Sequence, residues 1–168
     1  MSDYALEENP VEALKSAFRR HASGVAIITI TNEAGEPVGF TATSVTSLGA
    51  TPPLLTFNVA RGASSWPAVA RQGHVAIHIL REENVDLAKK LAGPHELRFL
   101  NDDWLEGPHG LPIFKDVAAV IIGKTRQIVD VEANAVVIVD VLSGLVCAEQ
   151  GGLLYHHRNF VGLGANLS

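Results

Sequence analysis

Apolar and β-branched residues occur in repeated runs along this chain, separated by short breaks. Some runs are nearly continuous and others alternate apolar with small polar residues, as buried and half-buried strands do. The runs predict strands over residues 25–31, 39–47, 54–60, 74–80, 118–129, 135–146 and 153–156. Residues 32–37 are predicted to be a hairpin loop, with position 38 starting the return strand. Six or more strands with only short helices between them predict a mainly β fold, a closed or partly closed antiparallel barrel.

The N-terminal segment shows helical spacing instead. Asn9 is a suitable N-cap, Pro10 suits the first helical position, and Glu12 would complete a capping box. Apolar positions then recur every three or four residues, at Val11, Leu14, Ala17 and Phe18. We therefore expect a helix that ends by Ser23-Gly24 and packs one face on the domain.

Two shorter helices are predicted further along the chain. Ser65 is placed to cap a helix over residues 66–72. Asn84 is placed to cap another helix, which ends at Gly93. The inward-facing positions of this second helix are Leu87, Ala88 and Leu91.

Residues 94–112 separate the last helix from the next strand and are rich in Gly, Pro, His and Asp. Such a length is unusual for a structureless loop within a domain. We expect this excursion to be a lid or a dimer contact.

Residues 39–67 contain most of the candidate chemistry. Hydroxyl groups occur at Thr41, Thr43, Ser44, Thr46 and Ser47. The Thr51-Pro52-Pro53 breaker follows, then a strand, then the small-residue loop 61–66 with the pattern Arg-Gly-x-Ser-Ser. This order suits a ligand with a flat polar ring and a phosphate tail, because the phosphate needs backbone N–H groups and a cation. The alternative is that the Thr and Ser residues act only as strand formers and helix caps.

The composition is that of a globular domain. The 168 residues are 47% hydrophobic and 18% charged, with a net charge of −5, which argues against nucleic acid as a partner. Cys147 is the single cysteine and lies in an apolar run, so we expect a buried, inert thiol and a reducing compartment. No run is long enough to span a membrane and no signal peptide is evident, so we expect a soluble cytoplasmic protein.

Several familiar motifs are absent from the sequence. It has no Gly-x-Gly-x-x-Gly fingerprint, no P-loop and no Gly-x-Ser-x-Gly elbow. Its seven histidines show no metal-ligand spacing, so we expect no metal.

The sequence resembles the flavin reductase family. The matching motifs are Gly-Phe-Thr-Ala-Thr-Ser-Val-Thr-Ser at 39–47, Pro-Pro-Leu-Leu at 52–55, Ser-Ser-Trp-Pro at 64–67, residues 88–93, Arg98-Phe99 and Leu-Tyr-His at 154–156. The likeness spans roughly residues 17–162. It implies one domain over residues 1–168, with 1–16 as an N-terminal extension and helix start, and an FMN-binding split barrel, a Greek-key antiparallel barrel of six strands.

The resemblance also implies the site. Thr41, Ala42, Thr43 and Ser44, with Phe57 and Asn58, are expected to line the flavin ring. Arg61, Ser64, Ser65 and Trp66 belong to the expected phosphate loop at the start of the short helix, and Arg98 and Phe99 to a pair near the flavin. His156 is the candidate catalytic residue, expected near the nicotinamide.

The sequence departs from the family pattern at two places. Many relatives carry Asn where this chain has His78, and many carry a glycine soon after the terminal Tyr-His, where this chain has residues 157–160. These departures affect the nicotinamide preference and the lid geometry.

The function that the resemblance implies is reduction of FMN or FAD by NADH or NADPH. A homodimer is expected, and the reduced flavin would pass to a partner monooxygenase. Two alternatives remain open on the same fold. One is a protein that binds FMN or haem without reducing free flavin, and the other is an oxidase like those acting on pyridoxamine phosphate.

Overall fold

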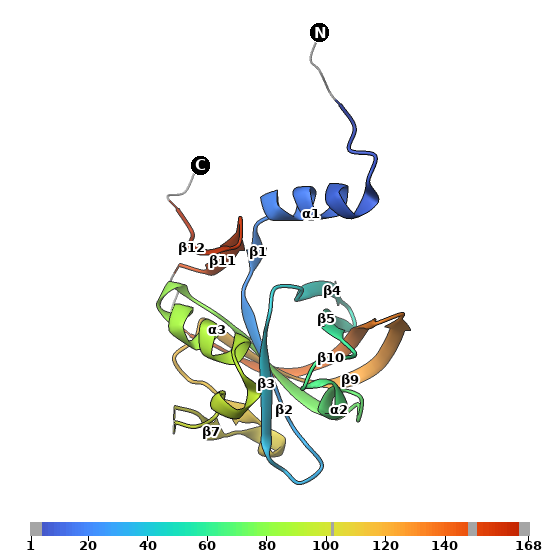
Figure 1. Cartoon of the computed structure of the whole chain (residues 1–168). Coiled ribbons are helices and arrows are strands. Elements are labelled where there is room, and N and C mark those ends of the chain that lie inside the picture. The colour runs from blue at the N-terminus through green and yellow to red at the C-terminus, as the bar shows by residue number, and fades with distance from the viewer. Residues whose placement is uncertain (1–4, 102, 148–150, 165–168) are drawn as a thin grey trace.

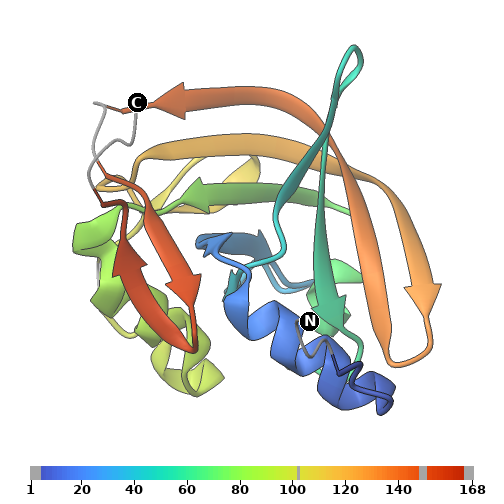
Figure 2. The ribbon, with the colours of Figure 1, turned by 90° about the horizontal axis from the view of Figure 1, so that it is seen from above.

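Seven antiparallel strands form the main sheet of this structure, a computed structural model that describes residues 5–101, 103–147 and 151–164 (Figure 1). In spatial order the strands are β3 (Pro37–Ala42), β2 (Ala26–Thr31), β6 (His74–Ile79), β9 (Ala119–Val131), β10 (Asn134–Val146), β5 (Pro53–Ala60) and β4 (Thr46–Ala50). Figure 2 shows β9 and β10 arching over the interior. Their pairing carries register shifts between Ile138 and Val139 and between Val141 and Ser143, and such bulges bend a strand pair.

Two smaller sheets and the helices complete the fold. A three-stranded sheet contains β1 (Ser23–Gly24), β11 (Leu153–His156) and β12 (Asn159–Gly162), and β7 (Leu105–Glu106) pairs with β8 (Pro112–Ile113). The α-helices are α1 (Pro10–Arg20), α2 (Trp66–Val69) and α3 (Val85–Ala92), with 3₁₀ turns η1 (Glu82–Asn84), η2 (His95–Leu97) and η3 (Pro108–Gly110). Within the described residues, no helix is long and apolar enough to cross a membrane.

Strand β2 is buried on both faces, so a hydrophobic cluster forms on each side of it. Ile28 belongs to the cluster inside the barrel, together with Phe57. Ile27 belongs to the other cluster, where α3 and the segment after β8 contribute Leu91 and Phe114. A strand covered on both sides reads as a continuous apolar run, which explains the strong strand signal at this position.

His78 is a buried polar residue of β6 that ties three segments together. Its Nε2 accepts a hydrogen bond from the Phe114 backbone N–H at 3.1 Å, so the proton is on Nδ1, which donates to the Ile27 carbonyl at 3.2 Å. Burial lowers the pKa of His78 to about 4, although the bond to Ile27 acts in the opposite direction. The imidazole is therefore neutral at physiological pH and has a structural role.

The mainly β fold expected from the sequence is confirmed, since the expected strands all pair in antiparallel fashion. The six strands β2, β3, β5, β6, β9 and β10 all belong to the main sheet, and the short β4 adds a seventh strand to it. The strand expected over residues 39–47 is not continuous, because β3 ends at Ala42 and β4 begins at Thr46. The bend between them turns Thr43 and Ser44 out of the ladder, which matters for the site below.

The expectations for α1 were only partly met. Asn9 caps the helix, since its side chain accepts from the Val11 and Glu12 N–H groups. The capping box was wrong: the Asn9 N–H donates to Glu7, and Glu12 pairs with Lys15. The packing of the apolar face was also wrong, because Val11, Leu14 and Phe18 are exposed by 55%, 60% and 64%. Helical spacing reports an apolar stripe but not what covers it.

Two further local expectations need correction. The helix expected over residues 66–72 is the single turn of α2, and Ser65 occupies its N-cap position without a capping hydrogen bond. Asn84 likewise precedes α3 without capping it, since its side chain joins the Arg81 N–H to the Asp116 carbonyl. Residues 94–112 contain η2, η3 and the β7–β8 hairpin, as their length suggested, and their role as a lid or dimer contact stays a prediction.

Candidate functional site

Two adjoining cavities meet at β3 and α3; the first extends to β5 and the loop before α2, and the second to the hairpin formed by β11 and β12. The first has a volume of about 490 Å³ and the second about 630 Å³, both within the usual range for cofactor pockets. Thr41, Thr43 and Ala92 line both cavities. Two ligands bound in these cavities would therefore lie side by side.

Strands β3 and β5 supply the polar wall of the first cavity. Ser44 is tied to β5, because its Oγ accepts from the Asn58 N–H at 2.9 Å and lies 3.4 Å from the Asn58 carbonyl. The Thr41 hydroxyl donates to the Ala88 carbonyl at 2.6 Å and so ties β3 to α3. In the described part of the chain, the side chains of Thr43 and Asn58 have no hydrogen-bond partner, which leaves them to meet the polar edge of a ligand.

Arg98 closes another side of the first cavity. Its Nε and Nη2 donate to the Gly93 carbonyl at 2.9 and 2.8 Å, and its Nη1 donates to the Gly39 carbonyl at 2.8 Å. A guanidinium has five N–H groups, so two remain for a ligand. Burial lowers the pKa of Arg98, but its ordinary value is so high that the group stays charged. Gly39 allows Phe99 and Leu91 to pack closely against β3, because a Cβ there would lie 2.9 Å from Phe99 Cζ and 3.2 Å from Leu91 Cδ1.

Ser64 and Ser65 lie in the loop before α2 and also line the first cavity. Within the described residues, their backbone N–H groups and hydroxyls donate to no protein acceptor, although Ser65 is only 2% exposed. Ser64 and Arg98 both border a further small cavity of about 80 Å³, so they belong to the same end of the first cavity. Free N–H groups beside a held guanidinium are suited to bind an oxyanion. Helix α2 is too short to add a large dipole.

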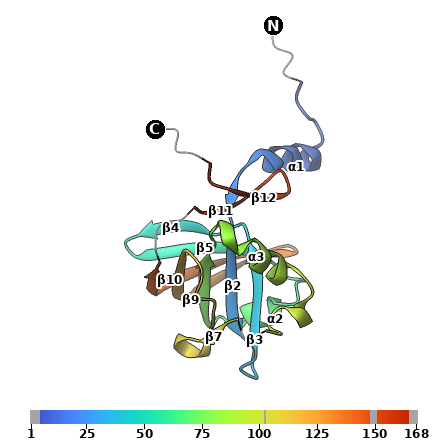
Figure 3. The same ribbon diagram turned by 90° about the vertical axis from the view of Figure 1, so that its left-hand side faces the viewer.

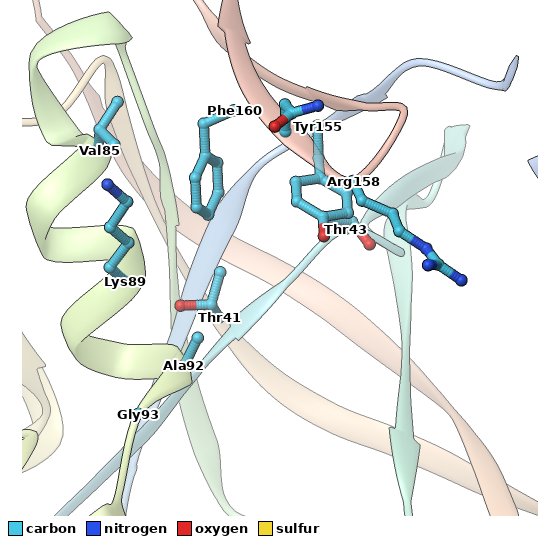
Figure 4. A pocket seen from close by; sticks show the side chains of 10 residues that line it. Thr41, Thr43, Val85, Lys89, Ala92, Gly93, Tyr155, Arg158 and Phe160 are labelled. Atoms are coloured by element: carbon cyan, nitrogen blue, oxygen red, sulfur yellow. The ribbon is translucent and has the colours of Figure 1, made fainter. Parts of the chain in front are cut away.

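The second cavity combines aromatic rings with positive charge (Figure 4). The rings of Tyr155 and Phe160 lie 5.3 Å apart between centroids and face the cavity from β11 and β12. In Figure 4, Lys89 of α3 and Arg158 of the β11–β12 turn lie on opposite sides of these rings. No acceptor within the described residues pairs with either cation. This arrangement suits an anionic ligand that also carries flat rings.

Most of the residues expected from the sequence line the first cavity. They are Thr41, Ala42, Thr43, Ser44, Asn58, Ser64, Ser65 and Arg98. Phe57 is fully buried and points into the core instead, because alternate residues of β5 face opposite sides. Phe99 packs against Phe114 and Trp104 rather than lining the first cavity.

Arg61 and Trp66 form a separate contact outside the first cavity. The Arg61 guanidinium lies 5.7 Å from the Trp66 ring centroid, and its Nη1 donates to the Glu132 carbonyl at 3.1 Å. Its Nη2 is also 3.7 Å from the Asp130 carboxylate. The structure therefore engages Arg61 with the β9–β10 turn, whereas Arg98 is the cation at the cavity.

His156 lines a different cavity from the two described above. This cavity has a volume of about 220 Å³ and also includes Phe18 and Arg19 of α1. It adjoins the second cavity, since Tyr155 and Arg158 line both. The neighbouring Tyr155, not His156, lines the second cavity, as expected from the alternation of side chains along a strand.

Several lining residues were missed from the sequence. Phe40, Leu91 and Ala92 carry no functional signal, because apolar residues at these positions look like ordinary core. Lys89 looks like a solvated helix residue until α3 is placed opposite Arg158. Among the described residues, no three His, Cys, Asp or Glu side chains are grouped so that they could hold a metal ion.

Comparison with known proteins gives a consistent result. The chain is 37% identical over 126 residues to a probable flavin reductase of Rhizobium meliloti, covering 75% of this chain but only 40% of that relative. It is 30% identical over 154 residues to the 4-hydroxyphenylacetate 3-monooxygenase reductase component of Pseudomonas aeruginosa, covering 89% of each protein.

A solved structure and a family model extend the comparison. The crystal structure of a flavin reductase domain protein from Arthrobacter sp. FB24 has 46% identity and a TM-score of 0.89, covering 93% of this chain and 97% of that one. Residues 18–164 match the model described as the flavin reductase like domain. This match includes both cavities and almost all of the barrel, and the chain therefore belongs to the flavin reductase family.

Proposed function

We propose that this protein is an NAD(P)H:flavin oxidoreductase, which reduces FMN or FAD with NADH or NADPH. The carrying observation is the pair of adjoining cavities with a common wall at Thr41, Thr43 and Ala92. Hydride transfer requires two flat cofactors held next to each other, and proximity supplies much of the rate acceleration. The names of the Rhizobium and Pseudomonas relatives support the same function.

The first cavity fits the flavin. Thr43 and Asn58 offer donors and acceptors to the polar edge of the ring. Ser64, Ser65 and Arg98 offer N–H groups to the phosphate. The side chains that hold the polar wall of the first cavity in place are hydrogen-bonded to backbone groups, so little side-chain ordering is needed when flavin binds.

The second cavity fits the nicotinamide cofactor. Tyr155 and Phe160 supply flat apolar surface, while Lys89 and Arg158 lie where phosphate groups would meet positive charge. The chemistry, transfer of a hydride from a nicotinamide to a flavin ring, is supplied by the two cofactors. The residues of this chain bind, orient and shield the pair from water.

The test is steady-state oxidation of NADH and NADPH in the presence of FMN, FAD or riboflavin. We expect oxidation that depends on added flavin, with FMN or FAD favoured over riboflavin because only they carry phosphate. Tight stoichiometric flavin without any NAD(P)H oxidation would contradict the proposal and identify a flavin-binding protein. Oxidation of pyridoxamine phosphate in place of NAD(P)H would identify the oxidase alternative.

We further propose that the protein delivers reduced flavin to a separate monooxygenase in the cytoplasm. The support is the similarity to the Pseudomonas protein, whose name makes it a reductase component. In this proposal residues 1–168 are one domain, with residues 1–16 as an extension that begins α1. Release of reduced flavin can be measured by its capture in a flavin-dependent monooxygenase assay with the two proteins separated by a dialysis membrane.

A homodimer is the third part of the proposal, and α1 is the surface that supports it. Its apolar face, Val11, Leu14 and Phe18, is exposed, and it stands beside the β11–β12 hairpin above the main sheet (Figure 3). Burial of these three side chains by a second copy would contribute several kcal/mol. Sedimentation should show a dimer that dissociates in Leu14→Gln/Phe18→Gln, while Glu12→Gln on the polar face should remain dimeric. A wild-type monomer that reduces flavin normally would refute this part alone.

A further inference from the structure

A stacked pair of histidines lines a separate cavity, which we call the histidine cavity. The imidazole rings of His74 and His109 are parallel within 4°, with centroids 3.6 Å apart. The cavity has a volume of about 200 Å³ and is also lined by Arg71 and Thr31. It shares no lining residue with either of the cavities assigned to flavin and nicotinamide.

The position of His109 is set by the β7–β8 hairpin. His109 lies in the 3₁₀ turn η3 at the tip of this hairpin and has a φ of 60°, which is unusual for a residue other than glycine. The hairpin is anchored, because the Pro112 carbonyl accepts a buried hydrogen bond from the Thr29 hydroxyl at 2.6 Å. His74 is the first residue of β6 and is fixed by strand pairing. The backbone that carries each of the two rings is therefore held in place by hydrogen bonds.

Positive charge gathers around this pair of rings. Lys124 is the strand partner of His74, and the Arg71 guanidinium has no acceptor within the described residues. Burial, the neighbouring His109 and Lys124 all lower the pKa of His74. Asp140 is the other strand partner of Lys124, and both of its carboxylate oxygens accept hydrogen bonds from Arg126.

We propose that the histidine cavity is a binding site for a phosphate group, held by Arg71, His74 and His109. A guanidinium binds a tetrahedral oxyanion through paired N–H donors, and a protonated imidazole adds a charged donor. Because the pKa of His74 is lowered, binding of an anion beside this ring takes up a proton there. A metal ion would fit poorly, because Arg71 would repel it and the described residues offer no third ligand.

This site would couple anion binding to the structure of the hairpin. A bound phosphate group would join the tip of the β7–β8 hairpin to the start of β6 and to the segment after α2. Ligands that bind only the folded state raise its stability by mass action. The ligand is either inorganic phosphate or the phosphate of an ester whose remaining part stays outside the cavity.

The test is NMR of protein labelled at histidine, titrated with inorganic phosphate and with sulfate against chloride at equal ionic strength. We expect saturable shifts of the His74 and His109 signals, which His74→Gln and His109→Asn assign. Sulfate keeps a constant charge, so its affinity should rise as the pH falls, by up to roughly tenfold per pH unit for each proton taken up. AMP that gives the same saturable shifts would support an ester ligand, and binding of inorganic phosphate alone would support the free ion.

Two variants make the outcome decisive. Arg71→Gln should weaken sulfate and phosphate binding by roughly tenfold or more, while leaving flavin reduction unchanged. Arg19→Gln removes the same charge at α1 and should leave the anion affinity unchanged. Histidine shifts no larger with sulfate than with chloride, or equal affinity in Arg71→Gln, would overturn the proposal.

Discussion

The first and second cavities have walls that are built in different ways. We call the wall formed by β3, β5 and Arg98 the barrel side, and the wall formed by α3 and the β11–β12 hairpin the hairpin side. On the barrel side, Arg98, Thr41 and Ser44 each bind backbone groups, so the polar wall is fixed before any ligand arrives. On the hairpin side, Lys89 and Arg158 have no partner among the described residues. We infer that the barrel side holds the flavin and that the hairpin side receives the nicotinamide cofactor.

The two sides also differ in the elements that support them. The barrel side rests on a core in which β2 and β6 are buried on both faces, and His78 ties them to the segment after β8. The hairpin side contacts α1, because the His157 N–H donates a hydrogen bond of 3.0 Å to the Arg19 carbonyl. Because α1 buries little of its own apolar face, the proposed second copy of the chain would complete this support.

The largest effect is expected at Arg98. Arg98→Lys cannot reproduce the three bonds to the Gly93 and Gly39 carbonyls, so the free energy of unfolding should fall by about 3 kcal/mol. FMN affinity should fall by roughly tenfold to a hundredfold, and riboflavin affinity by less, because riboflavin has no phosphate. Urea unfolding and flavin titration at fixed salt measure both effects.

Arg61→Ala is the matched control for this prediction. Arg61 binds the β9–β10 turn and Trp66 outside the first cavity, so its loss should change FMN affinity only slightly. A greater loss of FMN affinity in Arg61→Ala than in Arg98→Lys would move the phosphate to Arg61 and break the comparison between the two sides.

His78 predicts a pH dependence of the barrel side. Its pKa is about 4 in the folded protein and near 6.5 when unfolded, so the neutral ring stabilises the fold fully above pH 6.5. As the pH falls from about 6.5 to about 4, the unfolded chain takes up a proton that the folded protein does not. This group should therefore remove roughly 3 kcal/mol of stability over that range.

The measurement is the free energy of unfolding against pH for wild type and His78→Gln. The variant should lose less stability on acidification than the wild type does, whatever its stability at neutral pH. His95→Gln is the control, because the His95 side chain is 65% exposed and should leave the wild-type slope intact. Parallel curves for wild type and His78→Gln would show that the ring is not buried neutral.

The sequence predicted the barrel side much better than the hairpin side. Residues such as Thr41, Ser64 and Arg98 occur in short motifs, and their convergence follows once the strands are in register. For β11, the prediction depended on which face of the strand meets the cavity, because neighbouring side chains point to opposite faces. The placement of Lys89 opposite Arg158 depends on how the β11–β12 turn lies over α3, which no local pattern encodes.

A smaller effect is expected at Lys89 and Arg158, the two cations of the hairpin side. Both are exposed, so solvent and salt weaken their contacts with phosphate groups. Lys89→Gln and Arg158→Gln should each raise the KM for NAD(P)H by roughly threefold to tenfold, with kcat and FMN affinity nearly unchanged. Steady-state kinetics at low and high salt are the measurement, and the difference from wild type should shrink at high salt.

His156→Ala tests whether the nicotinamide site extends from the second cavity toward α1. His156 lines the neighbouring cavity beside α1, so its loss should raise the KM for NAD(P)H less than either cation does. The three variants together then distinguish charge in the second cavity from general support of the hairpin. If His156→Ala has the largest effect, the nicotinamide lies toward α1, and the free cations of the hairpin side serve another purpose. A drop in kcat at unchanged KM in the cation variants would instead place Lys89 and Arg158 close to the reacting rings.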